Sequence, residues 1–270
     1  PEFWEGTILA SVIGADGLQT LVGMAPRATI HSTNIIGNKT TYRGVDHDLE
    51  LAIVRAADLG VDIIVASLDQ RPGFFGVDSV WRPSHYNAVK YAYSMGVLMI
   101  DSAGYAYNTY MDYTIEYPAA FREVIAVGII EPVGGEWYPG AKGVICGYTS
   151  RGYNYDTNPG TIEDGDVEVA APGLFVWASY PGATPGNYTI CFGSWAAAAA
   201  AGHVAGLAAS VWYPCWADMN SWNVRVLLWA KALDMDYHVF FGYYDPYTGN
   251  LLVGEDPYTG FGVPILDIGP

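Results

Sequence analysis

The groups that could cleave a peptide bond through a serine nucleophile are few in this chain. Ser194 is followed by a tryptophan and a run of six alanines, and His203 follows that run after one glycine. Glu5 stands before Gly-Thr and an apolar stretch that is typical of a helix. A serine nucleophile needs an imidazole or a carboxylate to take its proton, and donors that stabilise the developing oxyanion. Hydrolytic chemistry therefore has to be sought first at Ser194, Glu5 and His203.

Apolar runs and helical periods alternate along the chain, which predicts a parallel sheet with helices on both faces. The predicted strands cover residues 28–36, 62–67, 97–102, 124–130 and 167–171, and the predicted helices cover 46–59, 84–95, 196–211 and 221–232. The strands are continuously apolar rather than alternating, as burial on both faces requires. No linker-like change of composition interrupts this region, so we expect one α/β domain over residues 1–233.

The C-terminal residues 234–270 contain a short repeat. The sequence Asp-Pro-Tyr-Thr-Gly occurs at 245–249 and again at 256–260. Asp-Pro at the start and Gly at the end suit tight turns. We therefore expect a hairpin extension that packs on the same domain.

The composition excludes several classes of protein. The chain has 270 residues, enough for a large core, and its apolar share of 51% excludes a disordered chain. The net charge is −16 with only 12 basic residues. Because phosphate binding depends on clustered Lys and Arg, we expect no nucleic-acid partner.

Neither a metal site nor a membrane span is predicted. Cys146, Cys191 and Cys215 are too widely spaced for a zinc site. We interpret them as buried free thiols, with a disulfide between Cys191 and Cys215 as the alternative. The nearly apolar segment 195–212 is short for a bilayer and contains two polar side chains, so we interpret it as a buried central helix.

The segment 192–206 resembles the nucleophile helix of the subtilisin-like serine peptidases. In that family the helix reads Gly-Thr-Ser-Met-Ala-x-Pro-His-Val-Ala-Gly, and residues 203–206 here read His-Val-Ala-Gly. The other segments that resemble the family, in the family's order, are 5–10, 23–28, 60–68, 96–104, 117–128, 149–152 and 169–173. The resemblance implies a subtilisin-like three-layer fold, with a mainly parallel central sheet and helices on both faces.

The resemblance also implies where a catalytic site would be, and this chain departs from the family at each position. An ungapped alignment puts the family's serine at Ala198, its histidine at Glu5 and its oxyanion asparagine at Tyr105. The family's aspartate belongs on a first strand upstream of Glu5. Because a methyl group cannot attack a carbonyl, we expect a non-catalytic chain that keeps the scaffold for binding or for a structural role.

Two alternatives keep catalysis open. An insertion of four residues in the helix would bring Ser194 to the nucleophile position, where Glu5 could serve as its base, as in related acid-active peptidases. Alternatively, the letters printed at Glu5 and at 196–202 are not those of the active molecule, and the protein is an active secreted endopeptidase with its aspartate on an upstream segment.

The resemblance further implies binding partners and a location. An extended peptide or protein segment would bind by strand addition in a groove, whose residues would be Ser67, Leu68, Asp69, Ser102, Ala103 and Gly104. The absent first strand would come from an upstream segment, a cleaved fragment or a partner chain. We expect no required cofactor, with structural calcium implied only by the family, and an extracellular or cell-surface location that the sequons at 38–40 and 187–189 permit.

Overall fold

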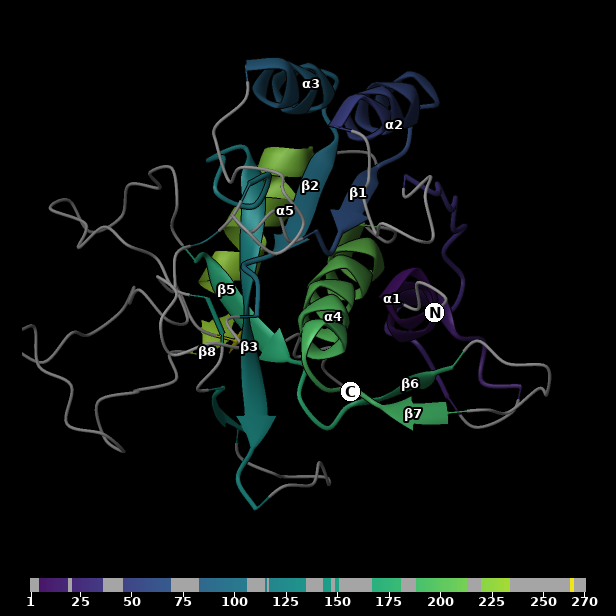
Figure 1. Ribbon diagram of the computed structural model, residues 1–270, viewed down its shortest axis with the longest axis vertical. Coiled ribbons are helices and arrows are strands. Elements are labelled where there is room, and N and C mark those ends of the chain that lie inside the picture. Colours follow the sequence, from purple (N-terminus) through teal and green to yellow (C-terminus); the bar gives the residue numbers. More distant parts are fainter. Residues whose placement is uncertain are drawn as a thin grey trace, which may run out of the picture.

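A central sheet lies between two layers of helices (Figure 1). The computed structural model describes residues 5–18, 21–35, 46–68, 83–105, 115, 117–134, 143–146, 149–150, 167–180, 188–212, 220–233 and 263–264. Within these ranges the sheet consists of β1 (Ile63–Ala66), β2 (Leu98–Ser102), β3 (Val124–Pro132), β4 (Gly143–Ile145) and β5 (Val169–Pro172). β2 pairs in parallel with β1 and β3, β5 pairs in parallel with β3, and β4 pairs antiparallel with β3. The mainly parallel sheet confirms the predicted α/β class.

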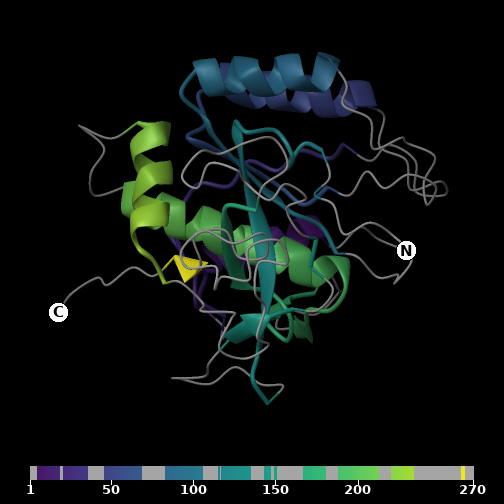
Figure 2. The ribbon, with the colours of Figure 1, turned by 90° about the vertical axis from the view of Figure 1, so that its left-hand side faces the viewer.

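The helices cover the sheet on both faces (Figures 1 and 2). They are α1 (Glu5–Gly14), α2 (Asp46–Asp58), α3 (Pro83–Ser94), α4 (Ser194–Trp212) and α5 (Ser221–Ala230). Neighbouring residues of β2 point to opposite layers, because side chains alternate along a strand. Met99 packs with residues of α2 and α3, whereas Leu98 and Ile100 pack with residues of α4 and α5.

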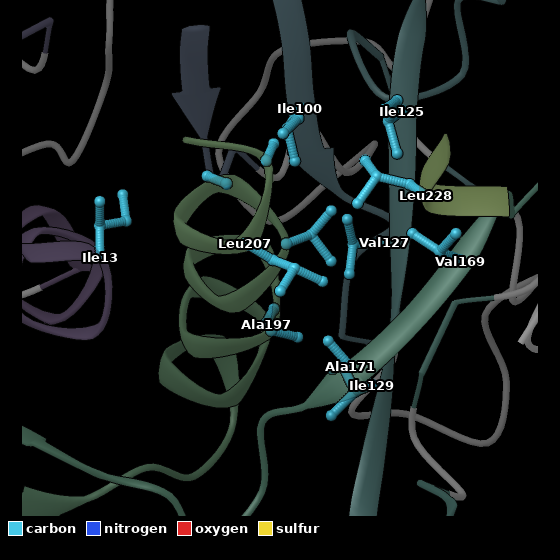
Figure 3. Close-up of a cluster of buried hydrophobic side chains, with 14 of the residues drawn as sticks. Ile13, Ile100, Ile125, Val127, Ile129, Val169, Ala171, Ala197, Leu207 and Leu228 are labelled. Atoms are coloured by element: carbon cyan, nitrogen blue, oxygen red, sulfur yellow. The ribbon is translucent and has the colours of Figure 1, made fainter. Parts of the chain in front are cut away.

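The larger core lies between α4 and the sheet. Figure 3 shows Val127 and Ile129 of β3 pointing toward Ala197 and Leu207 of α4. Leu228 of α5 closes the same cluster. Because α4 presents mainly alanine at its start, its backbone can approach the strands closely.

Two small antiparallel pairs lie outside the main sheet. β6 (Trp177–Ser179) pairs with β7 (Tyr188–Ile190), and β8 (Ala232–Leu233) pairs with β9 (Val263–Pro264). β9 comes from the predicted C-terminal extension and also contacts β5. The two Asp-Pro-Tyr-Thr-Gly repeats lie outside the described residues.

One strand prediction is wrong. Residues 28–35 form no strand, and all of them except the half-buried Ile35 are exposed. A strand needs a partner for its backbone groups, and among the described residues β1 pairs with β2 alone. β1 is therefore the edge strand on this side of the described sheet.

Candidate active site

The start of α4 and the start of α1 lie together because the two helices run side by side in the same direction. A Cβ atom placed on Gly202 would lie 3.2 Å from Cβ of Val12, and one placed on Gly206 would lie 2.6 Å from Cβ of Met24. Glycine at these positions lets α4 approach α1 and the segment that follows it. One turn before Gly202, Ala198 packs against Ile8 and Leu9 of α1.

The alanine run has a structural reason. All six alanines from 196 to 201 are at most 2% exposed. Ala196, Ala197 and Ala200 belong to the core on the sheet side, whereas the other three belong to the cluster with α1 and the β6–β7 hairpin. A helix that is enclosed on all sides at close range needs small side chains. Alanine at these positions therefore fits the packing. Ala198 is fully buried within it.

Ser194 and Glu5 are a pair of reactive side chains that the structure brings together at these helix starts. The hydroxyl of Ser194 donates a hydrogen bond of 3.0 Å to Oε1 of Glu5. Ser194 is the first residue of α4 and is exposed, and Glu5 is the first residue of α1 and is half-buried. The dipole of a helix start favours negative charge nearby, whereas the N–H groups of Trp195 and Ala196 already donate to the carbonyls of Phe192 and Gly193. The start of α4 therefore suits a developing oxyanion as well as the Glu5 carboxylate.

Tyr105, at the family's oxyanion position, lies beside the residue that precedes Ser194. Its side chain is 9% exposed, and its backbone forms a bridge with Thr149. A Cβ placed on Gly193 would lie 4.0 Å from Cε1 of Tyr105. The ring of Tyr105 therefore fills the space beside Gly193, where the family has the shorter side chain of an asparagine.

The predicted groove residues divide into exposed and buried ones. Ser67 and Leu68, which follow β1, are half-buried and remain partly open to solvent. Ser102, Ala103 and Gly104, which end and follow β2, are buried. Ala103 N–H donates to the carbonyl of Val127, and the carbonyl of Gly104 accepts from Ser150 N–H. Among the predicted groove residues that the structure describes, only Ser67 and Leu68 are open to a ligand. Asp69 lies outside the described residues.

His203 faces the sheet rather than Ser194. Its Nδ1 lies 2.7 Å from the carbonyl oxygen of Pro172, at the end of β5. Burial lowers the pKa of His203, although the hydrogen bond to Pro172 opposes this shift. A neutral imidazole tied to the sheet two turns into α4 has a structural role.

The cysteines are free thiols in the part of the chain that the structure describes. Cys146 and Cys191 are both buried, and neither is in a disulfide. Burial raises the pKa of Cys191 to about 12, which keeps the thiol protonated. Cys215 lies outside the described residues.

The described residues contain neither a cluster of acidic, histidine and cysteine side chains for a metal nor a membrane-spanning helix. No group of three or more His, Cys, Asp or Glu side chains there could hold a metal ion. No step of a mechanism is assigned to a metal ion. No described helix is both long and apolar enough to cross a bilayer.

Sequence inspection missed two buried carboxylates. Asp101 in β2 is 1% exposed and accepts hydrogen bonds from Leu68 N–H, at 3.2 Å, and Ser102 N–H, at 2.8 Å. Glu168, before β5, pairs with Arg225 of α5 and accepts a hydrogen bond of 3.0 Å from Nε1 of Trp229. Each carboxylate lies in or beside an apolar strand, and a charged residue in such a strand was the sequence feature that could have revealed it.

The fold and the paired helix starts define the class of the protein as a subtilisin-like serine peptidase scaffold. A profile described as the Subtilase family matches residues 4–243, and the chain belongs to this family. The subtilisin of Bacillus sp. (strain TA39) is 30% identical over 266 residues, which cover 95% of this chain and 56% of that protein. Thermitase of Thermoactinomyces vulgaris is 28% identical over 190 residues, covering 70% of this chain and 54% of that protein.

Solved structures agree with this assignment. Sphericase superposes with a TM-score of 0.75 at 28% identity and covers 97% of this chain and 77% of its own. The S41 psychrophilic protease gives the same TM-score and coverage at 27% identity. These findings confirm the subtilisin-like fold. The chain spans little more than half the length of the two curated relatives named above.

Proposed function

We propose that this chain is a peptide-binding member of the subtilase family that has lost ordinary serine peptidase activity at neutral pH. The observation that carries the proposal is the partner of Ser194: a carboxylate, Glu5, accepts its hydroxyl hydrogen where the family has an imidazole. A carboxylate is a much weaker base than an imidazole near pH 7, so it removes the proton of a serine poorly. The ring of Tyr105 beside Gly193 adds a second departure from the family's chemistry.

Peptide binding is supported by the exposed edge of β1. Its four residues are all half-buried, whereas those of β2, the next strand, are all buried. Since helices cover both faces of this sheet, we attribute the difference to the open edge of β1. An edge strand offers unpaired N–H and C=O groups to which an extended peptide can add. The charge of −16 favours a basic peptide.

Exposed aromatic side chains near Ser194 add apolar surface for such a peptide. Phe192 is 52% exposed and Trp177 of β6 is 57% exposed. The ring of Phe192 packs edge-on against Phe175, with 5.5 Å between the centroids. Rigid aromatic side chains are favoured at binding surfaces.

Hydrolysis of peptides at acid pH is a second candidate function. The 3.0 Å hydrogen bond between Ser194 and Glu5 favours it, because a nucleophile and its base must lie within this distance. In this case Ser194 and not Ala198 is the nucleophile, and Glu5 takes its proton. The dipole at the start of α4 then stabilises the negative charge of the oxyanion.

One experiment separates the two functions. The chain is treated with a fluorophosphonate probe and with fluorescent casein at a series of pH values from 3 to 8, beside Ser194→Ala and Ala198→Gly. The first proposal expects neither labelling nor hydrolysis above pH 6. Labelling at pH 7 that disappears in Ser194→Ala would overturn it, and activity confined to acid pH would establish the second function. Ala198→Gly is the matched control at the family's aligned position.

We also propose that another extended segment pairs with β1 along Ile63–Ala66, which leaves Ser67 and Leu68, after the strand, as the place where the extended peptide adds. The support is again the open edge in the described sheet, with the exposed residues 28–35 on the same side of the molecule (Figure 1). The segment is an upstream part of the polypeptide, a fragment that stays bound, or a partner chain. An extracellular or cell-surface location and bound structural calcium are further proposals, which glycosidase treatment and thermal unfolding with a chelator would test.

A further inference from the structure

Backbone groups on both sides of β1 are held by β2. The carbonyl of Asp62 accepts a hydrogen bond from Leu98 N–H of β2, and Leu68 N–H donates to a side chain of β2. In an extended strand the N–H and C=O groups of successive residues point to opposite edges. Even-numbered residues from Asp62 to Leu68 therefore face β2, and Ser67 turns its N–H and C=O toward the open edge.

Asp101 extends the pairing of β1 and β2 beyond the last backbone pair. That last pair is Ala66 with Asp101. Oδ1 of Asp101 then accepts both Leu68 N–H at 3.2 Å and Ser102 N–H at 2.8 Å. The hydroxyl oxygens of Ser67 and Ser102 lie 3.5 Å apart across the same two strand ends. One carboxylate oxygen thus holds the residue after Ser67 against β2.

A buried carboxylate is costly, and its presence needs a compensating role. Asp101 is 1% exposed, and hydrogen bonds to an ionised acceptor are stronger than those to a neutral one. The bond to Leu68 spans 33 positions of the chain, so it does not arise from a local turn. Its structural effect is to keep Ser67 extended with its backbone groups directed outward.

We propose that Asp101 is a positioning residue for peptide binding: it fixes Leu68 so that the backbone of Ser67 presents a donor and an acceptor to an extended peptide. The proposal rests on the peptide-binding function proposed above. Asp101 itself does not touch the peptide. It acts through the conformation of Ser67 and Leu68.

A decapeptide of alternating valine and lysine, labelled with fluorescein, is the binding probe. It favours the extended state and carries the positive charge that suits this chain. The same peptide methylated at the nitrogen of every second residue lacks half of its N–H donors and is the control ligand. Affinity is measured by fluorescence anisotropy on the full chain.

Four variants test the assignment. Asp101→Ala removes the acceptor of this hydrogen bond, and Leu68→Pro removes its donor, the N–H of residue 68. Each should weaken binding about tenfold, as the loss of one buried hydrogen bond does. Asp101→Asn keeps an oxygen acceptor in place and should bind within about threefold of the original chain. Glu168→Ala is the matched control, since Glu168 is also a 1% exposed carboxylate but pairs with α5. It should lower the melting temperature and leave the affinity unchanged.

Hydrogen exchange of the Leu68 amide separates the two proposals. Exchange should be about tenfold faster in Asp101→Ala, restored in Asp101→Asn and unchanged in Glu168→Ala. Unchanged affinity in Asp101→Ala, or unchanged exchange at Leu68, would overturn the role of Asp101. If the original chain bound both peptides equally or bound neither, the peptide-binding function would be refuted, and the positioning role with it. Faster exchange in Asp101→Ala would then still show that Asp101 holds Leu68. If Asp101→Ala does not fold, the test is the comparison of Leu68→Pro, which should bind weakly, with Asp101→Asn, which should bind normally.

Discussion

The hydroxyl of Ser194 donates a hydrogen bond to the carboxylate of Glu5 across 189 positions of the chain. Each residue opens a helix, and the two helices run together from this point. The pair lies at the corner where we propose that peptide chemistry would take place. Its chemistry differs from that of the family because a carboxylate stands in place of an imidazole.

Glu5→His should raise the reactivity of Ser194. An imidazole is a better base near pH 7, so fluorophosphonate labelling at pH 7 should increase about tenfold or more. Ala198→Ser is the companion variant, and it should remain unlabelled at residue 198 because that position is fully buried. Mass spectrometry of the labelled peptide identifies the residue, and a label on residue 198 would contradict the assignment.

Gly206→Ala should destabilise the packing of α4. The new methyl group would lie 2.6 Å from Cβ of Met24, so the helix or the adjoining segment must shift, at a cost of about 1–3 kcal/mol. Gly6→Ala in α1 is the matched control, because no atom lies within 4 Å of its added methyl group. That control should be stabilised by about 0.5–1 kcal/mol through helix propensity. Urea unfolding of both variants measures the difference, and equal effects would contradict the close approach.

Glu168→Ala should be strongly destabilising. Arg225 is 2% exposed, and without Glu168 its charge would remain in the core beside a neutral acceptor, the carbonyl of Arg122. Breaking a buried ion pair costs about 3–5 kcal/mol. The double variant Glu168→Leu with Arg225→Met should recover most of this loss. The exposed Arg122, which lies 3.6 Å from Glu123, provides the control, since Arg122→Ala should change stability by less than about 1 kcal/mol. A double variant as unstable as Glu168→Ala would contradict the explanation.

Cys191 should make the protein less stable at alkaline pH. Burial raises the pKa of its thiol from 9.0 to about 12. Between these values the unfolded chain loses a proton that the folded chain retains, so stability should be full below pH 9 and fall as the pH rises toward 12. Cys191→Ala should show a shallower fall over the same range in urea titrations. The folded protein should also resist iodoacetamide at pH 8, because the thiolate is the reactive form. Rapid alkylation of Cys191 in the folded state would be the contrary result.

Residues 1–270 produced alone should be less stable than the same chain with an extended segment bound along β1. The open edge of β1 leaves backbone groups unpaired, and each buried one costs about 1–3 kcal/mol against a typical net stability of about 5–15 kcal/mol. Size-exclusion chromatography and calorimetry measure the outcome. A monodisperse monomer with one cooperative transition would show that the sheet needs no additional segment.

Local sequence was sufficient for most helices and strands. The helix predicted at 46–59 is α2 (Asp46–Asp58), and the strand predicted at 97–102 is β2 (Leu98–Ser102). Such elements are encoded by the period of apolar residues and by nearby glycines, which act within a few positions. The order of the family segments then determined the subtilisin-like fold, because that order specifies which strands become neighbours.

Only the tertiary structure decided which side chains meet at the site. The ungapped alignment selected Ala198, whereas the packing of α4 on α1 buries that residue and sets Ser194 against Glu5. Residues 28–35 have the apolar and β-branched character of a strand but have no strand beside them in the described sheet. The bond from Leu68 to Asp101 likewise joins residues 33 positions apart. Contacts of this kind depend on the distance between elements after packing, which no local pattern of residues contains.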